Sequence, residues 1–552
     1  MQQKRYIWAL VFLGVIYLLN MRIEIMEVDA AQYASISLEM MESGSFLEVY
    51  HRGDDYLDKP PLLFWLSALS FQIFGVNELA YKLPSVMVLL LGLYALFRFT
   101  RMWYDKETAL LATTILGFTQ AFFLITNDVR TDGLLTGWVI FAVWQLSSFI
   151  RSGSWGNLIL GSLGVGLAMM TKGPIGLILP GAAIGADLLL KRQWKVIFHP
   201  QWLIFLLIVG ASLIPMCIGL YQQFDLHPEK EVYGLEGPSG LEFFFWTQSF
   251  GRITGDIYWD NGAPSYYFFL TMLWDFQPWV LFFFPAWGIG LYRLVLSKFR
   301  VADTAEYMSL GGFTLGFLML SLSNFKLPHY VFPLFPFAAI LTARYILQLN
   351  GKLLQRLSYA QWGLMQIFAL AVGAYFILGF PDGQILLPLV CLGLLGLAWW
   401  IWLKEQAQVR LLTSTLLVVF MLNLVMTVDF YPKLLSYQAT NQVGRKVLAA
   451  QKAQDQFFFY KVYGQGLDFY AQRINQWVDW GKIPSYPPGT WILTNEEGLS
   501  DIEGMKTHYR IIETYYDYNV TSIKLPFLLA ASREEMLKPL YLLEKEAVSK
   551  DE

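Results

Sequence analysis

The chain has 552 residues, of which 55% are hydrophobic, 17% are aromatic and only 15% are charged. This composition excludes an ordinary soluble protein of the same size and is typical of a protein that crosses a membrane several times. The formal net charge of −3 gives no electrostatic reason to expect a nucleic-acid partner.

Apolar runs near the length of a bilayer-crossing helix recur along most of the chain. They predict a polytopic α-helical membrane protein with about thirteen transmembrane helices. The predicted spans are residues 6–21, 84–98, 109–126, 132–150, 157–171, 174–190, 202–221, 265–292, 308–323, 330–349, 359–380, 384–403 and 411–428.

The positions of the basic residues predict the orientation of these spans. If the N-terminus lies in the cytoplasm, the cytoplasmic loops carry the excess of Lys and Arg that such loops usually have. These predicted cytoplasmic cations are Arg98, Arg101, Lys106, Arg151, Lys191, Arg192, Lys195, Arg293, Lys298, Arg300, Lys352, Arg356, Lys404 and Arg410. The opposite loops, including 22–83 and 222–264, are then expected on the periplasmic side of the inner membrane.

Residues 27–44, EVDAAQYASISLEMMESG, follow the first span. Tyr33, Ile36 and Met40 recur at helical spacing, which predicts a helix that lies on the membrane surface. Asp29 stands near the start of this helix, and two roles fit that place. It could simply cap the helix, or the helix N-terminus could hold an ionised catalytic carboxylate at the interface.

Further along the same external loop, YLDKPPLLFW joins an acid and a base to two prolines. Each proline lacks an N–H and restricts the residue before it, so a helix cannot continue through this point. The run Leu62–Phe74 that follows is too short to span a bilayer and is typical of an interfacial or re-entrant segment. Tyr56, Asp58 and Lys59 are therefore expected at the outer membrane surface.

Two motifs place charged residues where spans meet on this side. In NDVRTD, Asp128, Arg130 and Asp132 could form a helix cap and a surface ion pair, or Asp132 could belong to a functional site. In TKGP, Lys172 lies between two spans. An intramembrane lysine needs an anionic partner, such as a carboxylate or a lipid headgroup.

The later external loops add further candidates. SNFKLPHY offers Lys326, His329 and Tyr330, although a lone histidine is more often structural than catalytic. Arg252 lies in a loop rich in aromatic residues, and a guanidinium group binds phosphate in a bidentate manner.

All these charged groups fall on one predicted face of the membrane. They could merely solvate the ends of loops, but the predicted cytoplasmic loops lack comparable motifs, and ionisable groups at membrane depth tend to mark functional sites. Cations at headgroup level suit a lipid phosphate, aromatic faces suit a sugar ring, and paired carboxylates suit glycosyl chemistry. The sequence contains no zinc-site spacing, P-loop or dinucleotide fingerprint.

After the last span the chain becomes more polar. Residues 1–429 are expected to form the membrane domain, and residues 430–552 a small soluble α/β domain. An odd number of spans places that domain outside. Its predicted helices are Ala439–Ala450 and Glu534–Glu546, and its predicted strands are Phe457–Lys461, Thr490–Thr494 and Tyr509–Thr514.

Several of these motifs together resemble the membrane glycosyltransferases of the aminoarabinose transferase and protein O-mannosyltransferase group. The motifs are DAAQYA, DKPPLLFWLSALSFQIFG, GLAMMTKGPIGLILP and SNFKLPHYVFPLFPFAA, within residues 20–345. The resemblance implies the glycosyltransferase C fold and a polyprenyl-phosphate sugar as donor. The chain departs from the group at Asp29-Ala30, where Asp-Glu is frequent, at Asp58-Lys59, where Glu-Lys is frequent, and at Gln32, where lipid A enzymes usually carry Arg.

The resemblance also implies a reaction and roles for the candidates. An inverting enzyme would transfer one sugar from undecaprenyl phosphate to an acceptor such as lipid A at the outer leaflet. Lys59, Lys172 and Arg252 would stabilise the leaving phosphate, and Asp29 or Asp132 would act as the base. No cofactor is required, and a divalent metal is possible but not indicated. The alternatives are an O-glycosyltransferase acting on a protein or glycan, a ligase or polymerase with the same type of donor, and a transporter of lipid-linked sugars.

Overall fold

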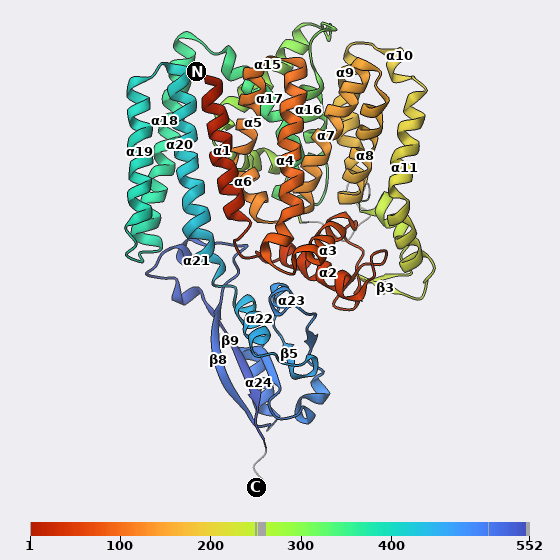
Figure 1. The fold of residues 1–552 in the computed structure, drawn as a ribbon, viewed down its shortest axis with the longest axis vertical. Helices are drawn as coiled ribbons and strands as arrows, with labels where there is room; N and C mark the ends of the chain where they lie inside the picture. Colours follow the sequence, from red (N-terminus) through yellow and green to blue (C-terminus); the bar gives the residue numbers. More distant parts are fainter. Residues whose placement is uncertain (1, 249–250, 252–260, 506, 548–552) are drawn as a thin grey trace.

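The computed structural model of the chain is a bundle of long helices with a small sheet-containing region at one end (Figure 1). It describes residues 2–248, 251, 261–505 and 507–547. Helix α1 begins at one end of the bundle, and the sheet lies beyond the opposite end.

The bundle contains helices from both halves of the apolar part of the chain, which precedes the sheet. In the first half these are α1 (Gln2–Asn20), α4 (Glu78–Trp103), α5 (Lys106–Gly117), α6 (Gln120–Asn127), α7 (Thr131–Ser152), α8 (Trp155–Lys172), α9 (Ile175–Leu190), α10 (Trp194–Ile197) and α11 (Gln201–Leu220). In the second half they are α14 (Tyr267–Asp275), α15 (Val280–Leu296), α16 (Met308–Ser321), α17 (Phe335–Gln348), α18 (Gly351–Ala374), α19 (Leu386–Lys404), α20 (Ala407–Val425) and α21 (Tyr431–Leu435).

The predicted class, a helical protein with several membrane spans, is confirmed. Among the described residues, seven helices are long and apolar enough to cross a membrane, or eight if α5 and α6, which meet at a bend of 58°, form one broken span. Four shorter apolar helices, at Leu62–Phe74, Ile175–Leu190, Val280–Leu296 and Met308–Ser321, fall below that length. The count of about thirteen spans therefore stays a prediction.

Two short helices lie across the end of the bundle nearest the sheet (Figure 1). They are α2 (Asp29–Ser43) and α3 (Leu62–Phe74), which are joined by the two-stranded β1 (Tyr50–His51) and β2 (Asp54–Asp55). Helix α3 begins directly after the two prolines, as their missing N–H groups predict. The segment between α11 and α14 contains β3 (Glu231–Val232), β4 (Leu235–Glu236) and α12 (Gly240–Glu242).

Close helix packing holds α7 in place. A Cβ added at Gly137 would lie 2.4 Å from the carbonyl oxygen of Val88, and one added at Gly92 would lie 2.9 Å from the Cα of Gly137. Glycine at both positions therefore lets the backbones of α4 and α7 touch, which is how membrane helices gain much of their packing energy. This close contact fixes the position of the first turns of α7, where Thr131 and Asp132 lie.

The C-terminal region contains one mixed sheet. The strands β5 (Phe457–Tyr460), β6 (Gln476–Trp477), β7 (Trp491–Asn495), β8 (Tyr509–Asp517) and β9 (Lys538–Lys545) pair in the order β6-β5-β7-β9-β8. Strand β5 is parallel to both of its neighbours, and β9 is antiparallel to both of its own. The helices of this region are α22 (Ala439–Ala449), α23 (Gly466–Ala471), α24 (Glu496–Gly504) and α25 (Leu525–Leu528).

One predicted helix of this region is wrong. The sequence predicts a helix over residues 534–546, but they form a short 3-10 turn at Glu534–Met536 followed by β9. Strand β9 lies between β7 and β8, and its neighbouring leucines Leu542 and Leu543 are both fully buried, in two different clusters. A strand that is covered on both faces loses the alternating pattern by which strands are recognised in a sequence.

A buried ion pair joins the first loop of the chain to the C-terminal region. The Arg52 Nε donates to Asp468 at 2.6 Å, and the two side chains are 7% and 0% exposed. The hydroxyl of Ser35 in α2 donates to the same carboxylate at 2.8 Å. Asp468 in α23 therefore holds the helix that carries Asp29.

We expect Asp468→Ala to destabilise the contact between α23 and the first loop by about 3–5 kcal/mol, because it leaves Arg52 buried without its main partner. Denaturant-dependent proteolysis of the full-length protein measures this change. As a control, Glu497→Ala removes a partner of Lys461 that is 72% exposed, and it should change proteolysis little. Equal proteolysis of wild type and Asp468→Ala would contradict the expectation.

Candidate active site

A polar cavity of about 220 Å³ lies where α2 and α3 cross the end of the bundle. It is small, but it gathers charged residues from segments that are far apart in the sequence. Its lining residues are Asp29, Tyr33, Asp58, Lys59, Arg130, Thr131, Asp132, Lys172, Phe325, Leu327, His329 and Tyr330.

Asp132 is the most enclosed carboxylate of the cavity, because its side chain is only 2% exposed. It lies in the first turn of α7, and the Lys172 Nζ at the end of α8 donates to it at 2.5 Å. The His329 Nε2 lies 3.7 Å from its other oxygen. The Lys172 Nζ also lies 3.9 Å from the centre of the Tyr330 ring. Asp132 is thus the partner that the buried position of Lys172 requires.

Asp29 lies in a more open position, with its side chain 37% exposed. The residue before α2 is Val28, so Asp29 occupies the first turn of the helix and not the cap position that one interpretation of the sequence assigned to it. Its carboxylate pairs with Arg130, which comes from the connection between α6 and α7. An acid in the first turn remains favourable for the helix because of the positive N-terminal end of the helix dipole.

Arg130 links two carboxylates. Besides Asp29, its guanidinium Nε donates to Asp128 at 2.5 Å. Burial raises the pKa of the Asp128 carboxyl above its ordinary value, although the charge of Arg130 acts in the opposite direction. The side chain of Asp128 is 3% exposed, so it is not the surface acid that one interpretation of NDVRTD suggested.

Asp58 and Lys59 contribute a third ion pair. The Lys59 Nζ donates to Asp58 at 2.7 Å, and the side chains of Lys59 and Asp58 are 14% and 28% exposed, respectively. The side-chain amide of Gln248 donates to the carbonyl oxygen of Asp58. The prolines that follow end this segment just before α3, which keeps both charged side chains at the mouth of the cavity.

The structure brings together eight of the twelve residues that the sequence singled out. These are Asp29, Tyr33, Asp58, Lys59, Asp132, Lys172, His329 and Tyr330. Tyr56 packs behind the cavity, with its ring centre 5.8 Å from that of Phe64. The Lys326 Nζ instead donates to the carbonyl oxygen of Ala263 at 2.9 Å, and Arg252 lies outside the described residues.

Arg130 is a charged lining residue that the sequence motifs do not single out as part of a site. The signal was present, since Arg130 stands between two aspartates in NDVRTD, but that pattern suggests only a surface ion pair. The cationic groups of Lys59, Arg130 and Lys172 therefore line the cavity together with the carboxylates of Asp29, Asp58 and Asp132. Such a site can neutralise a phosphate and still keep a carboxylate as a proton acceptor.

A resident metal ion would need several ligands of suitable type close together. In the part of the chain that the structure describes, no group of three or more His, Cys, Asp or Glu residues could hold one. The charged residues of the cavity are arranged as three ion pairs, each with its own cation.

Residues 58–218 match the family described as dolichyl-phosphate-mannose-protein mannosyltransferase. An undecaprenyl phosphate-α-4-amino-4-deoxy-L-arabinose arabinosyl transferase of Enterobacter sp. (strain 638) is 26% identical over 61% of this chain and 58% of its own length. Its counterpart from Edwardsiella ictaluri (strain 93-146) is 27% identical over 59% of this chain and 56% of its own length. The match therefore spans less than two thirds of either relative.

The fold is similar over almost the whole chain to a solved structure, that of ArnT from Cupriavidus metallidurans bound to undecaprenyl phosphate. The TM-score is 0.71 at 16% sequence identity, and the match covers 97% of this chain and 98% of the other. A structure of the same protein in the apo state gives a TM-score of 0.69 at the same identity and covers 97% of each chain. The chain therefore shares the fold of that protein over almost its whole length, and part of its sequence is similar to the group of membrane glycosyltransferases that its motifs resemble.

Proposed function

We propose that the protein is an inverting membrane glycosyltransferase. It transfers one sugar from a polyprenyl-phosphate donor, such as undecaprenyl phosphate, to an acceptor such as lipid A at the outer leaflet of the inner membrane. The observation that carries this proposal is the cavity lined by Lys59, Arg130 and Lys172 together with a half-buried carboxylate, Asp29. The names of the two bacterial relatives support the donor class.

In the proposed reaction an acceptor hydroxyl oxygen attacks the anomeric carbon of the sugar. The bond between that carbon and the phosphate oxygen breaks with inversion, and polyprenyl phosphate leaves with the bonding electrons. The phosphate carries the largest localised charge of the transition state, so fixed cations next to it lower the barrier. Lys59, Lys172 and Arg252 are the proposed contacts to this phosphate.

The two candidate bases differ in accessibility. Asp132 is enclosed, with its side chain only 2% exposed, and it is held by Lys172 at 2.5 Å, which leaves little room for a hydroxyl group. Asp29 keeps 37% of its side chain exposed. We therefore propose that Asp29 accepts the proton of the acceptor hydroxyl and that Asp132 positions Lys172 and His329. If the acceptor is itself a phosphate, Asp29 orients it without accepting a proton.

Transfer in vitro tests this proposal directly. Purified full-length protein in detergent is given a radiolabelled polyprenyl-phosphate sugar together with lipid A, a protein acceptor or a glycan acceptor in separate reactions. Label in lipid A supports the leading proposal. Label in protein or glycan supports the alternative O-glycosyltransferase or ligase, and movement of the donor across a vesicle membrane without any transfer supports a transporter.

We further propose about thirteen spans with a cytoplasmic N-terminus. On this topology residues 1–429 form the membrane domain, whereas the active site and residues 430–552 face the periplasm. In support of this topology, α2, α3 and the sheet lie at one end of the bundle, and α1 begins at the other (Figure 1). The predicted cytoplasmic cations belong to loops that follow the positive-inside rule.

Alkaline phosphatase fused after residue 552 should therefore be active in cells, because the enzyme folds only outside the cytoplasm. A fluorescent or β-galactosidase reporter that works only in the cytoplasm should be silent at the same position. The same reporters fused after Lys404, at the end of α19, should give the reverse result. Phosphatase activity after Lys404 and none after residue 552 would contradict the orientation.

A further inference from the structure

A large cavity of about 570 Å³ lies away from the candidate active site. It is formed where α15 and α17 end and where α16 and α18 begin, near the end of the bundle that holds the N-terminus (Figure 1). Its charged lining residues, all within the described part of the chain, are Arg293, Arg300, Glu306 and Arg344. Three guanidinium groups thus face one carboxylate.

The inner wall of this arginine cavity is built from a fixed polar network. The Tyr104 hydroxyl donates to Glu306 at 2.8 Å, and the guanidinium of Arg344 lies 4.5 Å from the centre of the same tyrosine ring. The backbone N–H of Tyr307 donates to the buried carboxylate of Asp187 at 2.9 Å. Glu306 is only 4% exposed, and its carboxylate accepts from Tyr104 and from the backbone N–H of Ser309, so it is engaged at the inner wall of the cavity.

The outer rim combines charge with exposed apolar surface. Arg293 and Arg300 are both exposed. Beside them, Tyr292 and Leu296 of α15 are each 63% exposed, and Leu353 of α18 is 51% exposed. Apolar side chains that remain exposed on a membrane helix face lipid chains. A molecule that has both an anion and hydrocarbon chains would satisfy both parts of the rim.

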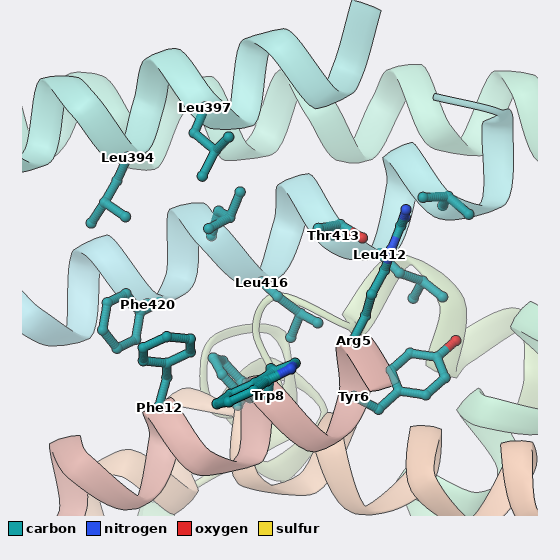
Figure 2. Close-up of a pocket in the computed structure, with 14 residues that line it drawn as sticks. Arg5, Tyr6, Trp8, Phe12, Leu394, Leu397, Leu412, Thr413, Leu416 and Phe420 are labelled. Atoms are coloured by element: carbon teal, nitrogen blue, oxygen red, sulfur yellow. The ribbon is translucent and has the colours of Figure 1, made fainter. Parts of the chain in front are cut away.

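Another cavity near the same end of the bundle is almost entirely apolar and serves as a comparison. Figure 2 shows it between α1, α19 and α20, lined by Trp8, Phe12, Leu416 and other apolar side chains. Its volume is about 340 Å³, and among its described lining residues Arg5 alone is charged. Arg5 already pairs with Glu405 at 2.8 Å. This cavity can hold a hydrocarbon chain, but it offers a headgroup only one cation.

We propose that the arginine cavity binds the phosphate headgroup of an anionic membrane lipid, with the acyl chains lying along α15 and α18. Basic pockets between helices on the cytoplasmic side of a membrane favour such headgroups, and guanidinium groups bind phosphate oxygens in pairs. The inference does not rest on the proposed transfer reaction, because it concerns the opposite end of the bundle and is tested by binding.

The test uses delipidated full-length protein in detergent and three probes: cardiolipin, phosphatidylcholine and glycerol phosphate. We expect cardiolipin to bind the wild type at least about tenfold more tightly than phosphatidylcholine, measured by native mass spectrometry. The double variant Arg293→Gln/Arg300→Gln should bind cardiolipin about 10–30-fold more weakly, because two cations near the headgroup are lost. Binding of glycerol phosphate as tight as that of cardiolipin would overturn the assignment to a lipid.

Two further variants make the result specific. The matched control Arg98→Gln/Arg101→Gln removes two exposed arginines near the end of α4, on the same side of the bundle, and it should change cardiolipin binding less than about twofold. Arg293→Lys/Arg300→Lys keeps the charge and should retain most of the affinity. An equal loss in the control, or no loss in Arg293→Gln/Arg300→Gln, would overturn the proposal.

Discussion

Asp29→Asn should reduce transfer by about 10²–10⁴-fold, because an amide cannot accept the proton of the acceptor hydroxyl. The substitution keeps the size of the side chain and can still accept a hydrogen bond from Arg130. Asp29 is the first residue of α2 and not its cap, so the helix loses no capping bond. Initial rates measured on folded protein, together with its melting temperature, separate chemistry from stability.

Asp132→Asn tests the competing assignment. It should also reduce transfer, but less than Asp29→Asn, because it releases Lys172 and His329 from their positions without removing the proposed base. Asp128→Asn disturbs Arg130 from a buried position and should have the smallest effect of the three. Asp54→Asn, an exposed acid of β2, is the neutral control. Full activity of both Asp29→Asn and Asp132→Asn would eliminate the carboxylate mechanism.

Lys59→Ala should lower the rate of transfer by at least about 10²-fold, since it removes a fixed charge from the leaving phosphate. It also leaves the Asp58 carboxylate without its 2.7 Å partner at the mouth of the cavity, where a negative charge repels the donor. Lys59→Arg keeps the charge and should recover part of the rate. The loss should appear in kcat as well as in KM, because the phosphate gains charge only as the bond breaks.

The control for this prediction is Lys404→Ala, an exposed lysine at the end of α19, far from the cavity. It should leave transfer unchanged. Near-normal turnover of Lys59→Ala would remove Lys59 from the proposed site. If Asp58→Asn/Lys59→Ala recovered activity that Lys59→Ala had lost, repulsion by Asp58 would explain the effect, and the phosphate contact would be excluded.

Local features of the sequence predicted much of the structure. The bounds of α3 match the apolar run after the two prolines, because proline acts only on its own neighbourhood in the chain. The ends of β5 and β7 differ from their predicted ends by one residue at most. Strand β8 begins where it was predicted to begin and extends further, to Asp517. Lys172 was expected to need an anionic partner, since a buried charge must be compensated wherever the chain folds.

Which side chains form ion pairs with one another could be read only from the tertiary structure. Arg130 and Asp29 are 101 residues apart, and nothing in either motif names the other. Residues 534–546 have the composition of a helix, but most of them form β9. This strand pairs with β7 and β8 along its two edges and buries its two faces in different hydrophobic clusters. The sequence by itself determined the membrane class, the helical runs and which charged motifs to inspect, because composition and spacing act locally. Only the tertiary structure decided which cation neutralises which carboxylate, because those contacts depend on how α2, α7 and α8 pack together.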